Sequence, residues 1–298
     1  MPRSRIHPSL AIGLISMAVI YFVGDAAFDG WSTHVSIPLG IGGLLAGYAA
    51  CIGPWRARLG GSAPVPREQW LCFVTACLIL FVSLTGPIHD ISDSYLFSGH
   101  MVQHLLITLL VPPMLLIGTP DWLVRRALRP APLARLERLL ATPLVAYLVF
   151  SGTVAVWHLP ALYNSTLIRL EVHVAEHLLF IVTAVIGWWP VLAPARELRP
   201  KIAFQMVYLL LLPFPMKIVG MLITLSDSVL YPAYAIAPRI WGLDPLADQQ
   251  IGGIMMWVPA GFVFWVTLAA HFFRWYGDSR SQDLGEVNVV PLTRERVL

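Results

Sequence analysis

The chain has few charged residues for its length. Of its 298 residues, 12% are Asp, Glu, Lys or Arg and 57% are hydrophobic, whereas about a quarter of a typical soluble domain is charged. So few charges cannot cover the surface of a water-soluble protein of this size. The composition therefore excludes a cytosolic globular enzyme, a disordered chain and a nucleic-acid-binding domain, and we expect no nucleic-acid partner.

Cysteine is also scarce. The three cysteines, Cys51, Cys72 and Cys77, lie in apolar segments and form no C-x-C or C-x-x-C pair. Neither a disulfide framework nor a thiolate metal site is indicated. The chain is instead rich in Trp and Pro, with 11 and 24 residues, which is typical of polytopic membrane proteins, where aromatic residues lie at the interfaces and Pro is tolerated in the spans.

Long apolar segments recur along the chain. A bilayer core of about 30 Å needs about 20 apolar residues per helix. Eight segments qualify or nearly qualify: 9–24, 35–54, 70–88, 96–118, 142–158, 172–193, 202–225 and 250–274. We predict an all-α, polytopic membrane helix bundle of about eight transmembrane helices. It is expected to be one domain over 1–298, with a separate N-terminal helix over 1–30, a core over 31–275 and a cytoplasmic tail over 276–298.

The basic residues predict an orientation. With the N-terminus in the cytoplasm, the inside segments hold 17 of the 20 Lys and Arg residues. The outside loops hold Arg169 and Arg239, and Lys217 lies within a span. Because inside loops of membrane proteins are enriched in Lys and Arg, we predict that both termini are cytoplasmic. The first segment could also be read as a signal peptide, but the charge alternation favours an uncleaved helix.

The histidines gather on the predicted outer side. Two helical segments read H-x-x-x-H, and residues four apart share one helix face. A further histidine closes the intervening span at its outer end. Polar groups inside a membrane are costly and usually functional. We therefore predict a metal or cofactor site in the outer leaflet, formed by His100, His104, His158, His173 and His177.

Imidazole suits Cu, Zn, Fe and Ni, and thioether adds a preference for Cu(I). Five methionines could supply thioether, although plain packing is the expected role of most: Met101, Met216, Met221, Met255 and Met256. Glu176 and Gln103 are candidate acceptors for imidazole N–H groups. Lys217 could be the counter-charge of Glu176 or could reach the outer surface. Asp248 could cap the last span or belong to the mouth of the site.

Three other functions compete with a copper site. The segment His173–His177 matches the H-x-x-E-H pattern of a zinc metalloprotease, which would need a third protein ligand. A b-type haem protein could use histidines of facing helices as axial ligands, but its two haems would usually lie at different depths. A metal transporter would need polar groups continuing toward the cytoplasm, and the inner halves of these spans are nearly all apolar.

Several blocks of the sequence resemble the CtaG-type cytochrome c oxidase assembly factors of bacteria. They are Ser98–His104 with Pro112, Pro113 and Gly118–Pro120; Trp157–Tyr163; Glu171, His173, Glu176 and His177 with Trp188–Pro190; and Pro245–Gln250 with Gly253 and Met256–Pro259. Together the blocks cover roughly 70–275, in the order and at the spacing of the family. The usual family core has seven spans, so the first helix here is an additional element.

The resemblance implies a non-enzymatic role in assembling haem–copper oxidases. It implies a multi-pass protein of the bacterial cytoplasmic (inner) membrane that works with cytochrome c oxidase subunits and periplasmic copper carriers. The resemblance also implies that His100, His104, His158, His173 and His177 are copper ligands. Copper held as Cu(I) in an outer-leaflet histidine cluster, and delivered to an oxidase subunit, is the expected function. A b-type haem protein and the H-x-x-E-H zinc protease remain the alternatives.

Overall fold

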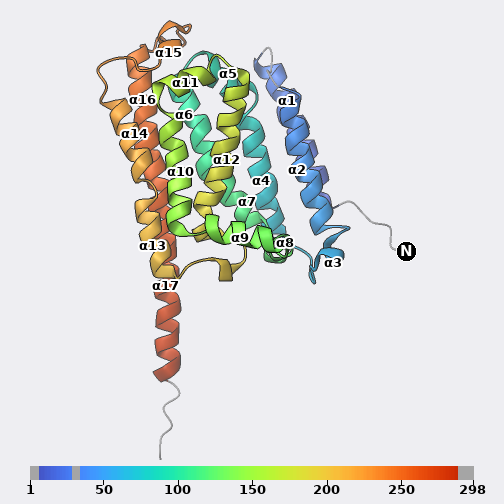
Figure 1. The fold of residues 1–298 in the computed structure, drawn as a ribbon. Coiled ribbons are helices and arrows are strands. Elements are labelled where there is room, and N and C mark those ends of the chain that lie inside the picture. The colour runs from blue at the N-terminus through green and yellow to red at the C-terminus, as the bar shows by residue number, and fades with distance from the viewer. Residues whose placement is uncertain (1–6, 29–33, 288–298) are drawn as a thin grey trace, which may run out of the picture.

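The computed structural model describes residues 7–28 and 34–287. These residues form helices and no strands, which confirms the predicted all-α fold (Figure 1). The expected charged ends of the chain, at 1–6 and 288–298, and part of the first expected outer loop, at 29–33, lie outside the described residues.

The longer elements correspond to the predicted spans. In chain order they are α1 (Pro8–Phe28), α2 (Ser36–Ile52), α4 (Arg67–Ser83), α6 (Phe97–Leu105) continued by η1 (Leu106–Leu110) and α7 (Val111–Gly118), α10 (Pro143–Trp157), α12 (Leu170–Leu192), α13 (Ile202–Leu211) with α14 (Phe214–Thr224), and α16 (Pro245–Trp257) with α17 (Pro259–Val287). The shorter elements are α3 (Arg56–Leu59), α5 (Gly86–Ser94), α8 (Asp121–Ala127), α9 (Ala131–Leu140), α11 (Pro160–Thr166), η2 (Arg196–Leu198) and α15 (Pro232–Ile236). The predicted tail from 276 therefore begins as a continuation of α17.

The number of spans depends on how bent helices are counted. Among the described residues, five helices are long and apolar enough to cross a membrane, and the number rises to seven if each of two bent pairs is one span. The pairs are α4 with α5, bent by 43°, and α9 with α10, bent by 72°. Helix α2 has only 17 residues, so the count of eight stays a prediction.

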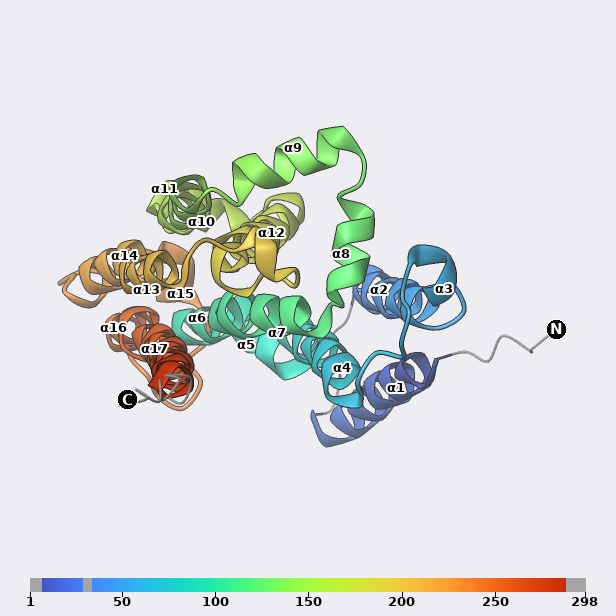
Figure 2. The same cartoon turned by 90° about the horizontal axis from the view of Figure 1, so that it is seen from below.

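The long elements run side by side, with α12 in the middle of the bundle (Figures 1 and 2). Helix α12 packs between α10 and α7, and α6 packs against α16. Helices α1 and α2 lie at one edge, where α1 contacts α4. Helices α8 and α9 lie across one end of the bundle, and α5, α11 and α15 lie at the other (Figure 1).

Two prolines set the register between α7 and α12. The carbonyl of Thr108 would normally accept from the N–H four residues on, but Pro112 has no N–H, and neither has Pro113 one residue later. The indole Nε1–H of Trp188 donates to this carbonyl instead, at 3.0 Å. A buried carbonyl needs a partner. This bond therefore fixes the height of α12 relative to the segment formed by α6, η1 and α7.

Helix α16 approaches α6 closely at a glycine. A Cβ atom on Gly252 would lie 2.4 Å from Cδ1 of Phe97, so a larger residue would push the two helices apart. One turn earlier, the buried carboxylate of Asp248 accepts from the backbone N–H of Phe97 at 2.7 Å and from that of Ser98 at 3.1 Å. Asp248 therefore caps α6 rather than its own helix, and Asp244 caps α16. Of the two roles predicted for Asp248, the structure has the helix cap, although at the start of α6 rather than of the last span.

Candidate metal centre

Four side chains converge between α6 and α12. One ligand atom from each of His100, His104, Glu176 and His177 lies within 4.8 Å of the others, and all four residues are buried. We call these four residues the metal centre. Nitrogens bound to one metal ion at about 2.0 Å lie within about 4 Å of each other, so the spacing of these four ligand atoms is close to the spacing that one ion requires.

The separations within the two histidine pairs follow from helical spacing. The Nε2 atoms of His100 and His104 lie 2.7 Å apart, and those of His173 and His177 lie 3.2 Å apart. Each pair is four residues apart, so both rings leave the same face of the helix. The ring centroids of His100 and His173 lie 5.7 Å apart across the two helices. The predicted convergence of the two pairs is therefore present in the structure.

The tautomer of His100 is fixed by a tyrosine. The hydroxyl of Tyr234 donates to the backbone carbonyl of Ser92 at 2.6 Å, so it accepts from Nδ1–H of His100, which lies 3.1 Å away. That arrangement leaves the lone pair of His100 on Nε2, which faces His104 and Glu176. A ligating histidine commonly donates its other N–H to such an outer partner. No local sequence pattern points to Tyr234, because it lies in α15, 134 residues after His100.

Glu176 lies among the imidazoles themselves. One carboxylate oxygen is 3.7 Å from Nε2 of His100, and the other is 3.8 Å from Nε2 of His104. The residue is fully buried, and neither oxygen has a hydrogen-bond partner among the described residues. We predicted Glu176 as an acceptor for imidazole N–H groups. Its position instead makes it a candidate ligand.

His173 connects the metal centre to a second group of polar residues. Its Nδ1 lies 3.4 Å from Oδ2 of Asp93, and the same oxygen lies 3.5 Å from Nε2 of His89. The ring of the exposed His34 lies against that of His89, with centroids 6.3 Å apart. Asp93 and His89 were not among the predicted site residues, although the two are four residues apart on one helix.

An open crevice leads to these residues. It has a volume of about 480 Å³ and lies between α2, α4 and α12. Its lining is mostly apolar, with four imidazoles: His34, His89, His173 and His177. Because His177 belongs to the metal centre, a succession of imidazoles runs from the crevice to the buried ligands.

His158 lies beside His104 but outside the metal centre. Its ring centroid is 5.8 Å from that of His104, and it is not among the four residues of the metal centre. The prediction placed it at the mouth of the site, yet its side chain is only 6% exposed. Whether His158 and His173 bind metal stays a prediction.

Two other polar residues have partners away from the metal centre. The side-chain amide of Gln103 donates to the carbonyl of Ser83 at 2.7 Å, and its oxygen accepts from the hydroxyl of Ser92 at 3.0 Å. The ammonium group of Lys217 lies 5.8 Å from the centre of the Trp265 ring. Among the described residues no ion pair joins Lys217 to Glu176, and the nitrogens near the Glu176 carboxyl group are those of imidazoles.

The fold and the site together define the class of this protein. It is an apolar helix bundle with a buried cluster of histidines and one carboxylate. The chain belongs to the cytochrome c oxidase caa3 assembly factor family (Caa3_CtaG), whose family model matches residues 46–278. This match confirms the resemblance seen in the sequence. It begins within α2, so α1 lies outside the matched region.

Curated relatives come from mycobacteria. An uncharacterized protein of Mycobacterium leprae is 24% identical over 276 residues, which cover 86% of this chain and 40% of that protein. Uncharacterized proteins of Mycobacterium bovis and Mycobacterium tuberculosis are each 25% identical over 231 residues, covering 72% of this chain and 34% of theirs. The chain thus spans two fifths or less of the length of these relatives. No solved structure matches the chain.

Proposed function

We propose that this protein holds copper, as Cu(I), in the metal centre and passes it to a cytochrome c oxidase subunit during assembly. The observation that carries the proposal is the carboxylate of Glu176, which is fully buried without a hydrogen bond and is faced by imidazole nitrogens. A buried, uncompensated charge costs several kcal/mol. A bound cation would remove that cost and use the four ligand atoms together.

The donor set is compatible with copper, and family membership supports that choice. The centre offers three imidazoles and one carboxylate, and neutral imidazole suits copper and zinc alike. Membership of a family described as oxidase assembly factors favours copper, the metal that haem–copper oxidases contain. Cu(I) accepts two or three ligands, so a cluster with spare imidazoles can release it one bond at a time without freeing the ion.

The succession of imidazoles supports an exchange role rather than permanent storage. His34 is exposed, His89 and His173 share Asp93, and His177 belongs to the centre. In this proposal copper enters from periplasmic carriers through the crevice and moves between neighbouring imidazoles. The bacterial cytoplasmic membrane, with the crevice end facing the periplasm, is the proposed location. The role is non-catalytic, because copper is cargo that leaves unchanged.

The two alternatives fit the geometry less well. A haem would place a wide macrocycle between histidines of the facing helices, but Glu176 already lies among them and the ligand atoms of all four residues are within 4.8 Å of one another, which suits a single ion. A zinc protease of the H-x-x-E-H type needs a later acidic ligand, but Asp244 and Asp248 cap helices. Metal identity and an absorption spectrum separate these functions.

The experiment is metal analysis of the purified protein together with its absorption spectrum. We expect copper in stoichiometric amount and no haem absorption. His177→Ala should lose copper and should fail to support an active oxidase in cells while the protein remains folded in the membrane. His271→Ala is the matched control, since His271 bonds to the Thr267 carbonyl in α17, outside the centre.

Three results would overturn the proposal. A haem spectrum would favour the haem alternative, and zinc in place of copper would favour the protease. A His177→Ala protein that keeps its full copper content and an active oxidase would show that this histidine is structural.

A further inference from the structure

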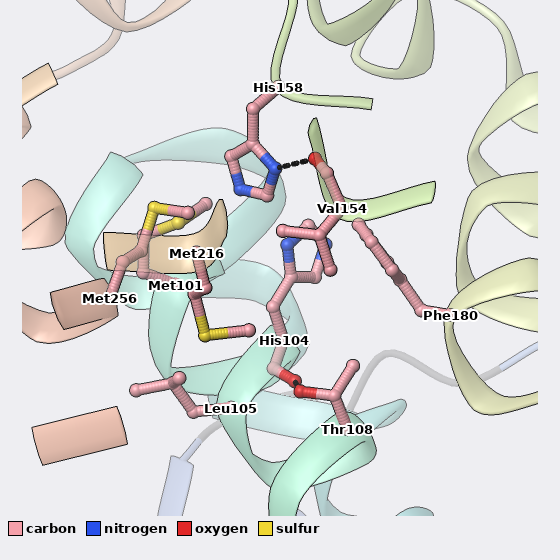
Figure 3. Close-up of a pocket in the computed structure, with 9 residues that line it drawn as sticks. All are labelled: Met101, His104, Leu105, Thr108, Val154, His158, Phe180, Met216 and Met256. Carbon is pink, nitrogen blue, oxygen red and sulfur yellow. Dashed lines mark hydrogen bonds between the residues drawn. The ribbon is translucent and has the colours of Figure 1, made fainter. Parts of the chain in front are cut away.

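A second, smaller site lies beside His104, and neither Glu176 nor His177 lines it. A cavity of about 10 Å³ is enclosed by α6, α10, α12, α14 and α16. Its lining combines two imidazoles, of His104 and His158, with three thioethers, of Met101, Met216 and Met256. Figure 3 shows the sulfur atoms gathered on one side and the two rings on the other. A cavity of this size holds one water molecule or one ion.

His158 is oriented as a ligand for this cavity. Its Nδ1 lies 2.7 Å from the carbonyl of Val154, so Nδ1 carries the proton and Nε2 carries the lone pair. Nε2 is buried and has no hydrogen-bond partner among the described residues. In Figure 3 this second nitrogen turns toward the sulfur atoms. An imidazole held through Nδ1–H to a backbone carbonyl is the usual arrangement of a metal-bound histidine.

The tertiary structure selects three of the five methionines named from the sequence. Met101, Met216 and Met256 are at most 7% exposed and line the cavity. Met221 is 43% exposed and is absent from the lining, as is Met255. The three sulfurs come from three different helices and meet opposite an imidazole lone pair. Hydrophobic packing of the three methionines alone would not require the lone pair of His158 Nε2 beside their sulfur atoms.

We propose that this thioether pocket, formed by Met101, Met216, Met256 and His158, binds a second soft monovalent ion. Thioether ligands select Cu(I) over zinc and other harder divalent ions, and no cysteine lines the cavity. The choice of copper as the natural ion rests on the proposed function, whereas the preference for a soft ion follows from the ligands alone. His104 lines both sites, so an ion held by the thioethers lies next to the metal centre.

One water molecule is the competing occupant. It could bridge Nε2 of His158 and Nδ1 of His104, both of which lack a hydrogen-bond partner among the described residues. Water needs two to four polar partners, and the sulfurs are weak acceptors. The two occupants differ in one measurable respect, because only an ion would have methionine atoms as neighbours in its first coordination shell.

The test is X-ray absorption at the copper edge on protein grown with selenomethionine and loaded with Cu(I). Selenium in the copper shell would report methionine ligands without confusion from the three cysteines. We expect copper–selenium scattering in the wild type. The triple variant Met101→Leu, Met216→Leu and Met256→Leu should lose this scattering and about half of the bound copper, since leucine keeps the volume but not the ligand. Met221→Leu, at the exposed methionine, is the matched control.

The outcomes separate this proposal from the proposed function. Absence of copper–selenium scattering in the wild-type protein would overturn the thioether pocket, with no need for a folded variant, and copper lost in His177→Ala would still support the metal centre. Conversely, copper–selenium scattering that persists in His177→Ala, without loss of copper, would overturn the metal centre and support the pocket. If His177→Ala loses only the copper that lacks selenium neighbours, both sites are supported.

Discussion

Glu176 shows how a single residue makes the metal centre unstable when it is empty. Its carboxyl group is fully buried, its oxygens lack hydrogen-bond partners among the described residues, and its neighbours are imidazoles. A carboxyl group buried without partners lowers the stability of the metal-free protein. A bound cation would give it a partner, so the residue favours the loaded protein over the empty one.

Replacing this carboxylate by its neutral isostere should separate the two effects. Glu176→Gln is expected to weaken Cu(I) binding at least ~10-fold, as loss of a ligand or its support commonly does. The metal-free variant should unfold at the same or a higher temperature, because the uncompensated charge is gone. Competition titration with a Cu(I) chelator and thermal unfolding in detergent measure the two quantities.

Glu171→Gln is the control for this change, since Glu171 is exposed in the first turn of the same helix and should leave both quantities unaltered. A metal-free Glu176→Gln protein that is strongly destabilised would show that the carboxylate has a structural partner and would contradict the prediction.

At the scale of elements, the position of α6 depends on contacts from distant helices. Asp248 of α16 caps the N-terminal end of α6. Trp188 of α12 donates to the Thr108 carbonyl, which has no helical partner because Pro112 lacks an N–H. His100 and His104 lie between these two points. The helix is therefore held at both ends of the segment that carries the ligands.

Removing the cap should disturb the metal centre without touching a ligand. Asp248→Ala leaves two backbone N–H groups and the Ser98 hydroxyl without their acceptor. We expect a loss of about 1–3 kcal/mol in stability, together with weaker copper binding because α6 is no longer fixed. Thermal unfolding and Cu(I) titration measure both effects. Asp244→Ala, which uncaps α16 on the exposed side, should cost only about 1 kcal/mol and leave copper binding intact.

Packing of the leucines that follow His104 in the chain should contribute to the stability of the protein but not to copper binding. Leu109 is 3% exposed, whereas its neighbour Leu110 is 39% exposed. Leu109→Ala should lower stability by about 2–5 kcal/mol, because it opens a cavity in the core, and Leu110→Ala should cost much less. Both variants should bind copper like the wild type. Equal losses from the two would indicate that Leu110 is covered by a partner in the membrane.

The whole molecule is asymmetric from one end to the other. The metal centre, the thioether pocket and the crevice lie toward the end with α5, α11 and α15, and the Arg-rich α8 and α9 lie across the opposite end. Arg125 of α8 forms an ion pair with Glu197 of η2 at that end. Basic ends of membrane proteins face the cytoplasm, so the asymmetry predicts that the copper sites open to the periplasm.

Reporter fusions test this orientation. A reporter fused after residue 298 should be active in the cytoplasm, and one inserted between α15 and α16 should be active in the periplasm. An insertion between α8 and α9 is the control and should match the C-terminal fusion. The reverse pattern would contradict the charge argument and would place the metal centre on the cytoplasmic side.

Local sequence patterns were sufficient for the elements and for the histidine pairs. The low charge and the apolar segments predicted helices close to those observed, because a membrane helix satisfies its own backbone hydrogen bonds and needs no distant partner. The spacing of His100 and His104, and of His173 and His177, predicted their common faces, because helical periodicity is local. The bends between α4 and α5 and between α9 and α10 were not predicted. The span count stayed open because each bent pair can be counted as one span or as none.

The sequence by itself therefore determined an apolar helical protein with two pairs of imidazoles, each pair on one helix face. Only the tertiary structure decided which groups meet those imidazoles. Glu176 became a candidate ligand, Asp248 caps a helix 150 residues away, and His158 joined three methionines from three helices. These contacts depend on the rotation and height of each helix against its neighbours. Close packing and buried hydrogen bonds between distant segments set both, and no short stretch of sequence contains that information.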